Sequence, residues 1–332
     1  MKNIKTTILT IFIVMCISET LFAQDYIFSQ TSTSQIYQNP AVAGNTDRLS
    51  ATIIHRLQWP YENIATPATC LAIDFVPNIK NSGISLVALN GHDIGTKETV
   101  NQIGLSYSYS IQLSEKLIIK AGLRGGLYHR KLGKNLLYGD QYNENGTLTG
   151  NETEENISDK AIYKADFAVG ALLSYKEISW IGISVAHVTR PNISLLLGSE
   201  STLPILWNIN AGYIFYLNKT VKDRKSLTPT FSWYKQANFA QYSLGGYFFN
   251  KPLQLGLWYK GNPFDRYEGS TQNQAITIAV GLSFQQLNVE YSYDISLSKF
   301  QKSGGAHEFS ITYKLPYEEK RGKVRSVSGP KW

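Results

Sequence analysis

The stretch Val100–Gln112, VNQIGLSYSYSIQ, decides the fold. From Gln102 onward its apolar residues alternate with small or polar ones, and these apolar residues are Ile103, Leu105, Tyr107, Tyr109 and Ile111. Successive side chains of a strand point to opposite faces, so one face is apolar and the other, with Ser106 and Ser108, is polar. The pattern holds for about 11 residues, the length that a tilted strand needs to cross a bilayer. Strands of soluble proteins are usually about 5–6 residues long. The stretch therefore predicts a membrane-spanning β-strand.

Similar alternation recurs along the chain and predicts fourteen strands. They cover residues 49–58, 69–76, 83–90, 100–112, 117–130, 162–175, 179–188, 208–217, 227–234, 241–249, 253–260, 274–284, 287–296 and 307–315. An even number of antiparallel strands is typical of barrels in the outer membrane, where closure of the sheet leaves no free edge. We therefore expect an all-β protein, an antiparallel transmembrane β-barrel of about 14 strands.

The connections between the predicted strands mostly alternate between long and short. The long ones include residues 59–68, 91–99, 131–161 and 189–207, and the short ones include 77–82, 113–116, 176–178 and 285–286. Outer-membrane barrels have short periplasmic turns and longer extracellular loops. The pattern thus predicts an outer-membrane protein of a Gram-negative cell, with both ends of the mature chain in the periplasm.

The two ends of the chain differ from the predicted barrel in composition. Lys2 and Lys5 precede an apolar segment at residues 8–17, and Leu21-Phe22-Ala23 follows it, as in a secretory signal. Asn39-Pro40 is one of several turn signals in the polar segment that follows. The predicted division is a signal peptide at 1–23, an N-terminal periplasmic leader at 24–48, the barrel at 49–315 and a basic periplasmic tail at 316–332.

Composition argues against several other classes of protein. Charged residues make up 17% of the chain, and the formal net charge of +7 is too dispersed for nucleic-acid binding. Cys70 alone would survive the predicted cleavage, so we expect no intramolecular disulfide. No later apolar run approaches the length of a transmembrane helix.

We expect no enzyme activity, no cofactor and no metal. The five histidines are scattered and none has the spacing of metal ligands. His129 and His187 fall beside Ser-rich strands, which leaves a barrel lipid hydrolase as one alternative, although no particular serine is marked. The acidic loop 140–159 lacks the spacing of a calcium loop.

Several charges fall on the inward faces of the predicted strands. They include Lys120, Arg124, Asp166 and Glu290. Buried charges must be paired or hydrated. These residues therefore belong either to a closed, ion-paired interior or to a water-filled pore, and the second possibility makes a passive channel for small solutes another alternative.

Five parts of the chain resemble the PorP/SprF family of outer-membrane proteins. They are FSQ and QNPAVAGN in the leader (28–30 and 38–45), HRLQW (55–59), SVAHVTRP (184–191), GLWYKG (256–261) and the closing YSYDISLSKFQKSGGAHEFSITYKL (291–315). Together they span nearly the whole mature chain. The chain departs from the pattern in having Pro60 directly after Trp59 and a basic tail beyond the last predicted strand.

The resemblance implies a role in type IX protein secretion and gliding motility of Bacteroidetes. It implies an accessory or anchor protein that supports export or surface attachment of secreted adhesins or enzymes. The partners so implied are outer-membrane lipid, a secreted cargo protein, and periplasmic ring or motor components of the secretion system, with no nucleic acid. Catalysis is not implied.

The leader is expected to be a folded periplasmic or lumen-entry element, because Phe28, Tyr37 and Val42 would be exposed to water in a slack segment. These apolar groups would dock against the lower rim of the barrel or against a partner. The partner-binding candidates in the shared motifs are Phe28, Gln30, Asn39, Pro40, Gly44, Arg56, Gln58 and Trp59.

Overall fold

The structure is a computed structural model that describes residues 24–46, 49–61, 64–133, 141–143, 145, 147–150, 161–218, 225–261, 274–297 and 302–315. The predicted signal peptide and basic tail lie outside these residues, as does most of the loop 131–161. Among the described residues, no helix has both the length and the apolar character needed to span a membrane.

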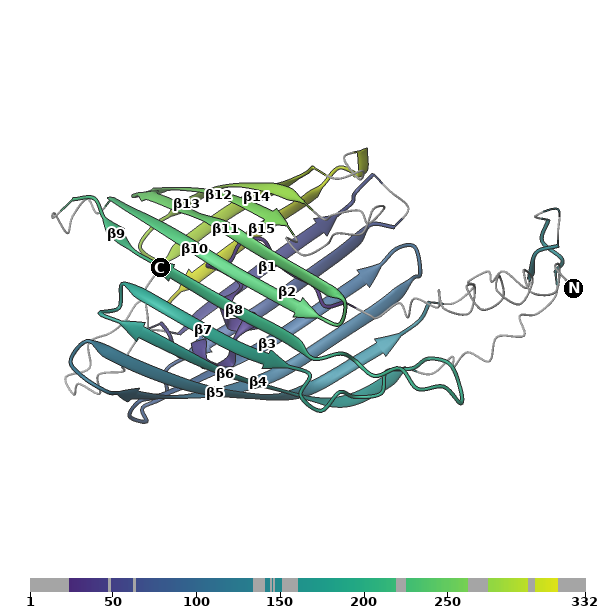
Figure 1. Ribbon diagram of the computed structural model, residues 1–332, viewed down its shortest axis with the longest axis horizontal. Helices are drawn as coiled ribbons and strands as arrows, with labels where there is room; N and C mark the ends of the chain where they lie inside the picture. The colour runs from purple at the N-terminus through teal and green to yellow at the C-terminus, as the bar shows by residue number, and fades with distance from the viewer. Residues whose placement is uncertain are drawn as a thin grey trace, which may run out of the picture.

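The strands form one closed antiparallel sheet with a marked tilt (Figure 1). They are β1 (Ser50–Gln58), β2 (Thr66–Phe75), β3 (Ser82–Asp93), β4 (Glu98–Gln112), β5 (Leu117–Lys131), β6 (Ile162–Tyr175), β7 (Ser179–Ala186), β8 (Leu206–Tyr213), β9 (Phe215–Tyr216), β10 (Lys225–Gln236), β11 (Phe239–Asn250), β12 (Leu253–Gly261), β13 (Ala275–Ser283), β14 (Leu287–Ser296) and β15 (Ala306–Lys314). The ring closes where β1 pairs with β15, with Ser50 opposite Lys314.

The predicted barrel is confirmed. β8 and β9 both pair with β10 and are two parts of one strand interrupted at Ile214, so the fifteen strand segments make fourteen barrel strands. Each of the fourteen predicted ranges overlaps one of these strands, with boundaries that differ by a few residues. The alternation of apolar and polar side chains was sufficient to predict the strands, because it is a local property of each strand.

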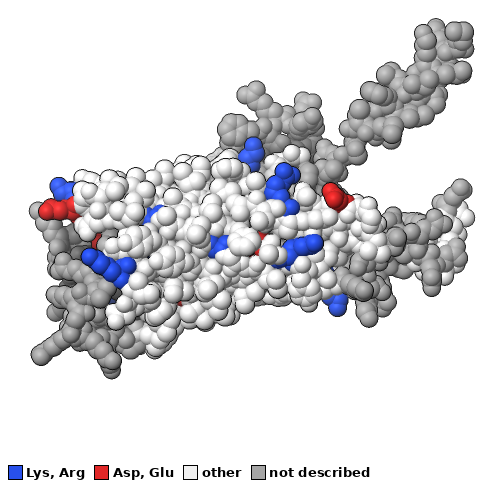
Figure 2. Space-filling view, turned by 90° about the horizontal axis from the view of Figure 1, so that it is seen from below, with Lys and Arg blue, Asp and Glu red and all other residues white. Residues whose placement is uncertain are grey.

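The predicted faces of β4 are also confirmed. Leu105, Tyr107 and Tyr109 are exposed on the outside of the barrel, whereas Ser106 and Ser108 are completely buried on the inside. The same arrangement continues around the ring, so large apolar side chains cover the exterior. On the face shown in Figure 2, most of the described surface carries no charge, and charged side chains are few. Such an exterior suits contact with lipid.

The core of the described protein is the interior of the barrel, and the leader occupies it. Residues 24–46 include a short helix α2 (Gln35–Gln38) and a 3₁₀ turn η1 (Pro40–Val42), which lie within the ring of strands (Figure 1). Phe28 packs with Ile54, Cys70 and Leu89 in one apolar cluster. Ala41 and Val42 pack with Leu172 and Trp180 in another.

The leader runs through the lumen from one mouth to the other. The backbone N–H of Asp25 donates to Gln236 at the end of β10, on the side of the long connections. The backbone N–H of Gly44 donates to Asp74, near the end of β2 and on the side of the short turns. Leu315 also lies on that side, bonded to Leu49. The described ends of the chain are thus at opposite mouths, whereas the sequence-based prediction placed both ends on the periplasmic side.

Replacing Leu105 by Arg should destabilise the barrel by about 2–4 kcal/mol, because this side chain lies in the middle of the exterior apolar band of β4. Leu113→Arg, just beyond the end of the same strand, should cost about 0–1 kcal/mol, since the penalty falls near the interface. Urea unfolding of the protein reconstituted in lipid vesicles measures both values. Equal losses in the free energy of unfolding would contradict the placement of Leu105 in the middle of the apolar band and of Leu113 near its edge.

Candidate functional site

The leader that fills the lumen is the candidate functional site, and its own sequence shapes it. The side chain of Asn39 accepts a hydrogen bond from the backbone N–H of Ala41 and so caps η1, which begins at Pro40. The hydroxyl of Ser34 donates to the carbonyl of Gln30, which closes the turn before α2. These local bonds make the leader a compact segment rather than an extended tail.

Glycines on the inner wall let the leader approach the strands closely. A Cβ added to Gly122 of β5 would lie 2.3 Å from the backbone nitrogen of Ala41. A Cβ added to Gly83 of β3 would lie 2.2 Å from the carbonyl oxygen of Ala43. Gly44 has a φ of +67°, a conformation that favours glycine, where the chain turns toward β1. The inner wall is therefore shaped to fit this segment.

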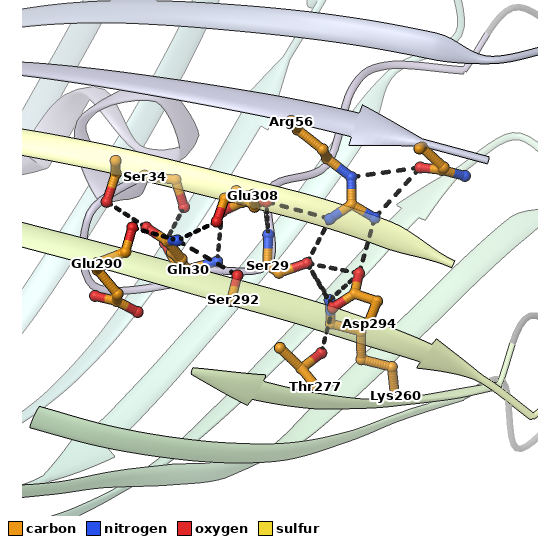
Figure 3. A network of polar contacts seen from close by, with 12 residues as sticks. Ser29, Gln30, Ser34, Arg56, Lys260, Thr277, Glu290, Ser292, Asp294 and Glu308 are labelled. Atoms are coloured by element: carbon orange, nitrogen blue, oxygen red, sulfur yellow. Dashed lines mark hydrogen bonds and ion pairs between the residues drawn. The ribbon is translucent and has the colours of Figure 1, made fainter. Parts of the chain in front are cut away.

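A buried charge network holds the start of the leader (Figure 3). The backbone N–H groups of Ser29 and Gln30 each donate to one carboxylate oxygen of Glu308 on β15, both at 2.8 Å. The guanidinium of Arg56 on β1 pairs with Glu308 at 3.2 Å and with Asp294 on β14 at 2.9 Å. Two backbone donors and one cation therefore share a single buried carboxylate.

The four charged side chains of this network balance one another. Lys260 on β12 pairs with Asp294 at 3.1 Å, and the hydroxyl of Thr277 donates to the same carboxylate at 2.6 Å. The hydroxyl of Ser29 donates to Asp294 at 2.7 Å, which ties the leader to both acidic residues. Arg56 and Lys260 balance the two carboxylates, as buried ions require.

A second group of bonds holds the other half of the leader through its main chain. The ammonium group of Lys120 donates to the carbonyl of Ala43 at 3.0 Å. The guanidinium of Arg124 donates to the carbonyl of Tyr37 at 2.7 Å and also to the carbonyl of Ile36. Two cations on β5 thus bind carbonyl dipoles of the leader, so these lumen charges have partners within the protein.

His187, just after β7, links the start of the leader to the barrel. Its ring nitrogens lie 2.5 Å from Asp25 and 2.9 Å from Asp166 of β6. Burial alone would lower the pKa of His187, but the charge of Asp25 and the hydrogen bond to Asp166 raise it above its usual range. Burial alone would raise the pKa of Asp25, yet the charge and hydrogen bond of His187 lower it below its usual range. At neutral pH the two groups therefore form an ion pair.

The structure places most of the predicted partner-binding residues inside the barrel. Phe28, Gln30, Asn39, Pro40, Gly44 and Arg56 are buried. Gln58 and Trp59 line a cavity of about 440 Å³ at the mouth with the long connections. Arg56 also lines this cavity, so in this conformation a partner at the mouth would reach only Arg56, Gln58 and Trp59 of these residues.

The four predicted lumen charges all belong to the interior. Lys120, Arg124 and Asp166 make the contacts described above. Glu290 accepts hydrogen bonds from Tyr247 at 3.0 Å and from Gln254 at 3.2 Å. Sequence reasoning missed the residues that complete the network, which are Asp25, Asp74, His187, Lys260, Asp294 and Glu308. Asp294 and Glu308 could have been found, since both fall on the polar face of an alternating strand.

The described residues of this site bear on two kinds of reaction centre, a metal site and a serine–histidine pair. Among the described residues, no three or more His, Cys, Asp or Glu side chains lie where they could hold a metal ion. Both ring nitrogens of His187 face carboxylates, and Nδ1 of His129 faces Asn101, so neither contact is the serine–histidine pair of a hydrolase.

Together, the fold and the site define a membrane β-barrel whose lumen is filled by its own N-terminal segment. The chain belongs to the family described as type IX secretion system membrane protein PorP/SprF, whose model matches residues 20–313. The family and the barrel fold point to the outer membrane and to association with components of this secretion system. Among curated proteins, none matches the chain.

Several solved membrane barrels resemble the chain at low sequence identity. A FadL homologue of Pseudomonas aeruginosa is 12% identical, with 86% of this chain and 94% of that one covered, at a TM-score of 0.46. The toluene transporter TbuX of Ralstonia pickettii is 10% identical, with 86% and 94% covered and a TM-score of 0.49. The monoaromatic hydrocarbon channel CymD is 13% identical, with 86% and 93% covered and a TM-score of 0.48.

Replacing Arg56 by Met should destabilise the protein by about 3–5 kcal/mol, because Asp294 and Glu308 would lose a buried cation. Arg130 is a matched control: its ion pair with Glu98 at 2.6 Å is less buried, so Arg130→Met should cost less. Urea unfolding gives the two losses, and limited proteolysis reports release of the leader. A loss for Arg56→Met no larger than that for Arg130→Met would show that the network contributes little.

Proposed function

We propose that the protein is a closed outer-membrane barrel that serves as an accessory or anchor component of type IX protein secretion. In this role it supports the export or surface attachment of secreted proteins and contacts periplasmic ring or motor components. Membership of the PorP/SprF family over residues 20–313 supports the assignment to this pathway. The family description is that of a membrane protein and names no reaction, which is consistent with a non-enzymatic role.

One observation favours an accessory role over a passive solute channel: the leader fills the lumen. It bonds to strands on all sides of the ring, including β1, β2, β5, β10, β14 and β15. Cavities of about 440 and 480 Å³ lie at the two mouths, and the cavity described between them measures only about 50 Å³. A lumen occupied in this way favours contacts with other proteins, rather than passage of solutes, as the function of the barrel.

Deleting Asp25–Ala43 should distinguish an accessory role in secretion from a passive solute channel. The intact protein is expected to show no steady conductance in planar bilayers, whereas the deletion variant should conduct because its charged lumen becomes hydrated. In cells, surface display of a protein that the type IX system exports should be lost, while heat-modifiable barrel persists in the outer membrane. A steady conductance of the intact protein, or normal display with the deletion variant, would contradict the proposal.

We also propose an orientation, with the long connections outside the cell and the short turns in the periplasm. The basic tail, which follows Leu315, would then begin on the periplasmic side, as the sequence analysis expected. Gln24 would instead lie at the extracellular mouth, because the leader crosses the lumen.

An epitope tag inserted between Gln24 and Asp25 should therefore be recognised by antibody on intact cells. The same tag after Glu177, in the turn between β6 and β7, should be recognised only after the outer membrane is permeabilised. A single cysteine at Asn145, in a Cys70→Ser background, should react with an impermeant maleimide on intact cells. A folded barrel whose tag at Gln24 stays hidden until permeabilisation would contradict the proposed path of the leader.

A further inference from the structure

A row of polar side chains crosses the outside of six neighbouring strands, near the mouth with the long connections. The row consists of His55 on β1, Thr69 on β2, Asn90 on β3, Asn101 on β4, His129 on β5 and Tyr163 on β6. Each residue lies directly opposite the next one in the β-ladder. None of them takes part in the network that holds the leader, so the row needs a separate explanation.

The side chains of this row contact one another along the barrel surface. Nδ1 of His55 lies 2.8 Å from the hydroxyl of Thr69. The amide of Asn90 donates to Asn101 at 2.7 Å, and the amide of Asn101 lies 2.9 Å from Nδ1 of His129. The rings of His129 and Tyr163 are 4.7 Å apart. These contacts leave Nε2 of both histidines and the hydroxyl of Tyr163 without a partner among the described residues, and so available to a ligand.

The row marks the upper edge of the apolar exterior. On each strand, the next outward residue toward the middle of the barrel is apolar, and these residues are Ile53, Leu71, Ala88, Ile103, Leu127 and Ala165. Polar groups directly above an apolar band lie at the level of lipid headgroups.

A groove in the outer surface joins the polar row to the apolar band. Its volume is about 540 Å³, and Asn90, Asn101 and His129 are among its lining residues. Below them it is lined by Ala88 between Leu71 and Ile103, its direct neighbours in the ladder. Because the side chain of Ala88 is shorter than those on either side, the surface is depressed there.

We propose that this groove binds a glycolipid, with its sugar headgroup on the polar row and an acyl chain over Ala88. The six side chains of the row include amides, imidazoles and hydroxyls but no Lys, Arg, Asp or Glu. Sugar hydroxyls both donate and accept hydrogen bonds, as these groups do, whereas a headgroup with only phosphate would favour Lys or Arg. The proposed orientation places this groove in the outer leaflet of the membrane. Glycolipid binding itself does not depend on that orientation or on any role in export.

Native mass spectrometry of the full chain in mild detergent, with added lipid A, tests the proposal. The double variant Asn90→Leu/Asn101→Leu removes the headgroup bonds, and Ala88→Phe fills the groove without changing the polar row. The double variant should weaken lipid A binding by about tenfold or more, the value of one or two lost hydrogen bonds, and Ala88→Phe should weaken it by excluding the acyl chain. His307→Leu is the matched control, since His307 is an outward residue of β15 bonded to Tyr291, away from the groove. It should bind as the parent does, and heat-modifiability confirms that each variant is folded.

Three results would overturn the proposal. The first is unchanged lipid A binding by folded Ala88→Phe or by the folded double variant. The second is equally tight binding of phosphatidylethanolamine to the parent, which would indicate ordinary annular lipid. The third is unchanged lipid A binding together with loss of a co-purifying membrane protein from the variants, which would make the groove a protein interface.

Discussion

The structure depends on neutralising the charges that the closed sheet turns inward. Arg56, Lys120 and Arg124 point into the lumen and are wholly or partly buried there, so each needs a partner within reach. The leader supplies part of that pairing through its own main chain, with N–H groups for Glu308 and carbonyls for the two cations of β5. The leader and the barrel therefore form one polar interior, in which each supplies hydrogen-bond partners to the polar groups of the other.

This arrangement constrains how the barrel closes. The leader precedes β1, and β1 pairs with both β2 and β15, so the leader lies inside the ring formed by the first and last strands. An already closed sheet would require the leader to be threaded through one mouth past the glycine-lined wall. Closing the β1–β15 ladder around a leader already bound to β14 and β15 avoids that step. Arg56 of β1 completes the same network, so docking of the leader stabilises the junction between the first and last strands without being required for it.

The two faces of the wall carry different chemistry because side chains alternate along every strand. Tyr128 and His129 show this clearly, since they are adjacent in β5. Tyr128 is buried in the interior beside His187, whereas His129 belongs to the polar row on the outside. Pairing within the lumen and contact with lipid can therefore change independently, as long as the alternation is kept.

The sequence by itself determined the strands, their number and the faces of their side chains. The alternation that begins at Gln102 is visible without a partner strand, and so is the inward position of Lys120, Arg124 and Glu290. It did not determine where the leader lies or which charges pair. Arg56 meets Asp294 across 238 positions of sequence, and Asp25 meets His187 across 162, only because the sheet curves into a ring. The tertiary structure alone decided that the leader spans the lumen, since the position of a buried segment depends on the shape of the complete wall around it.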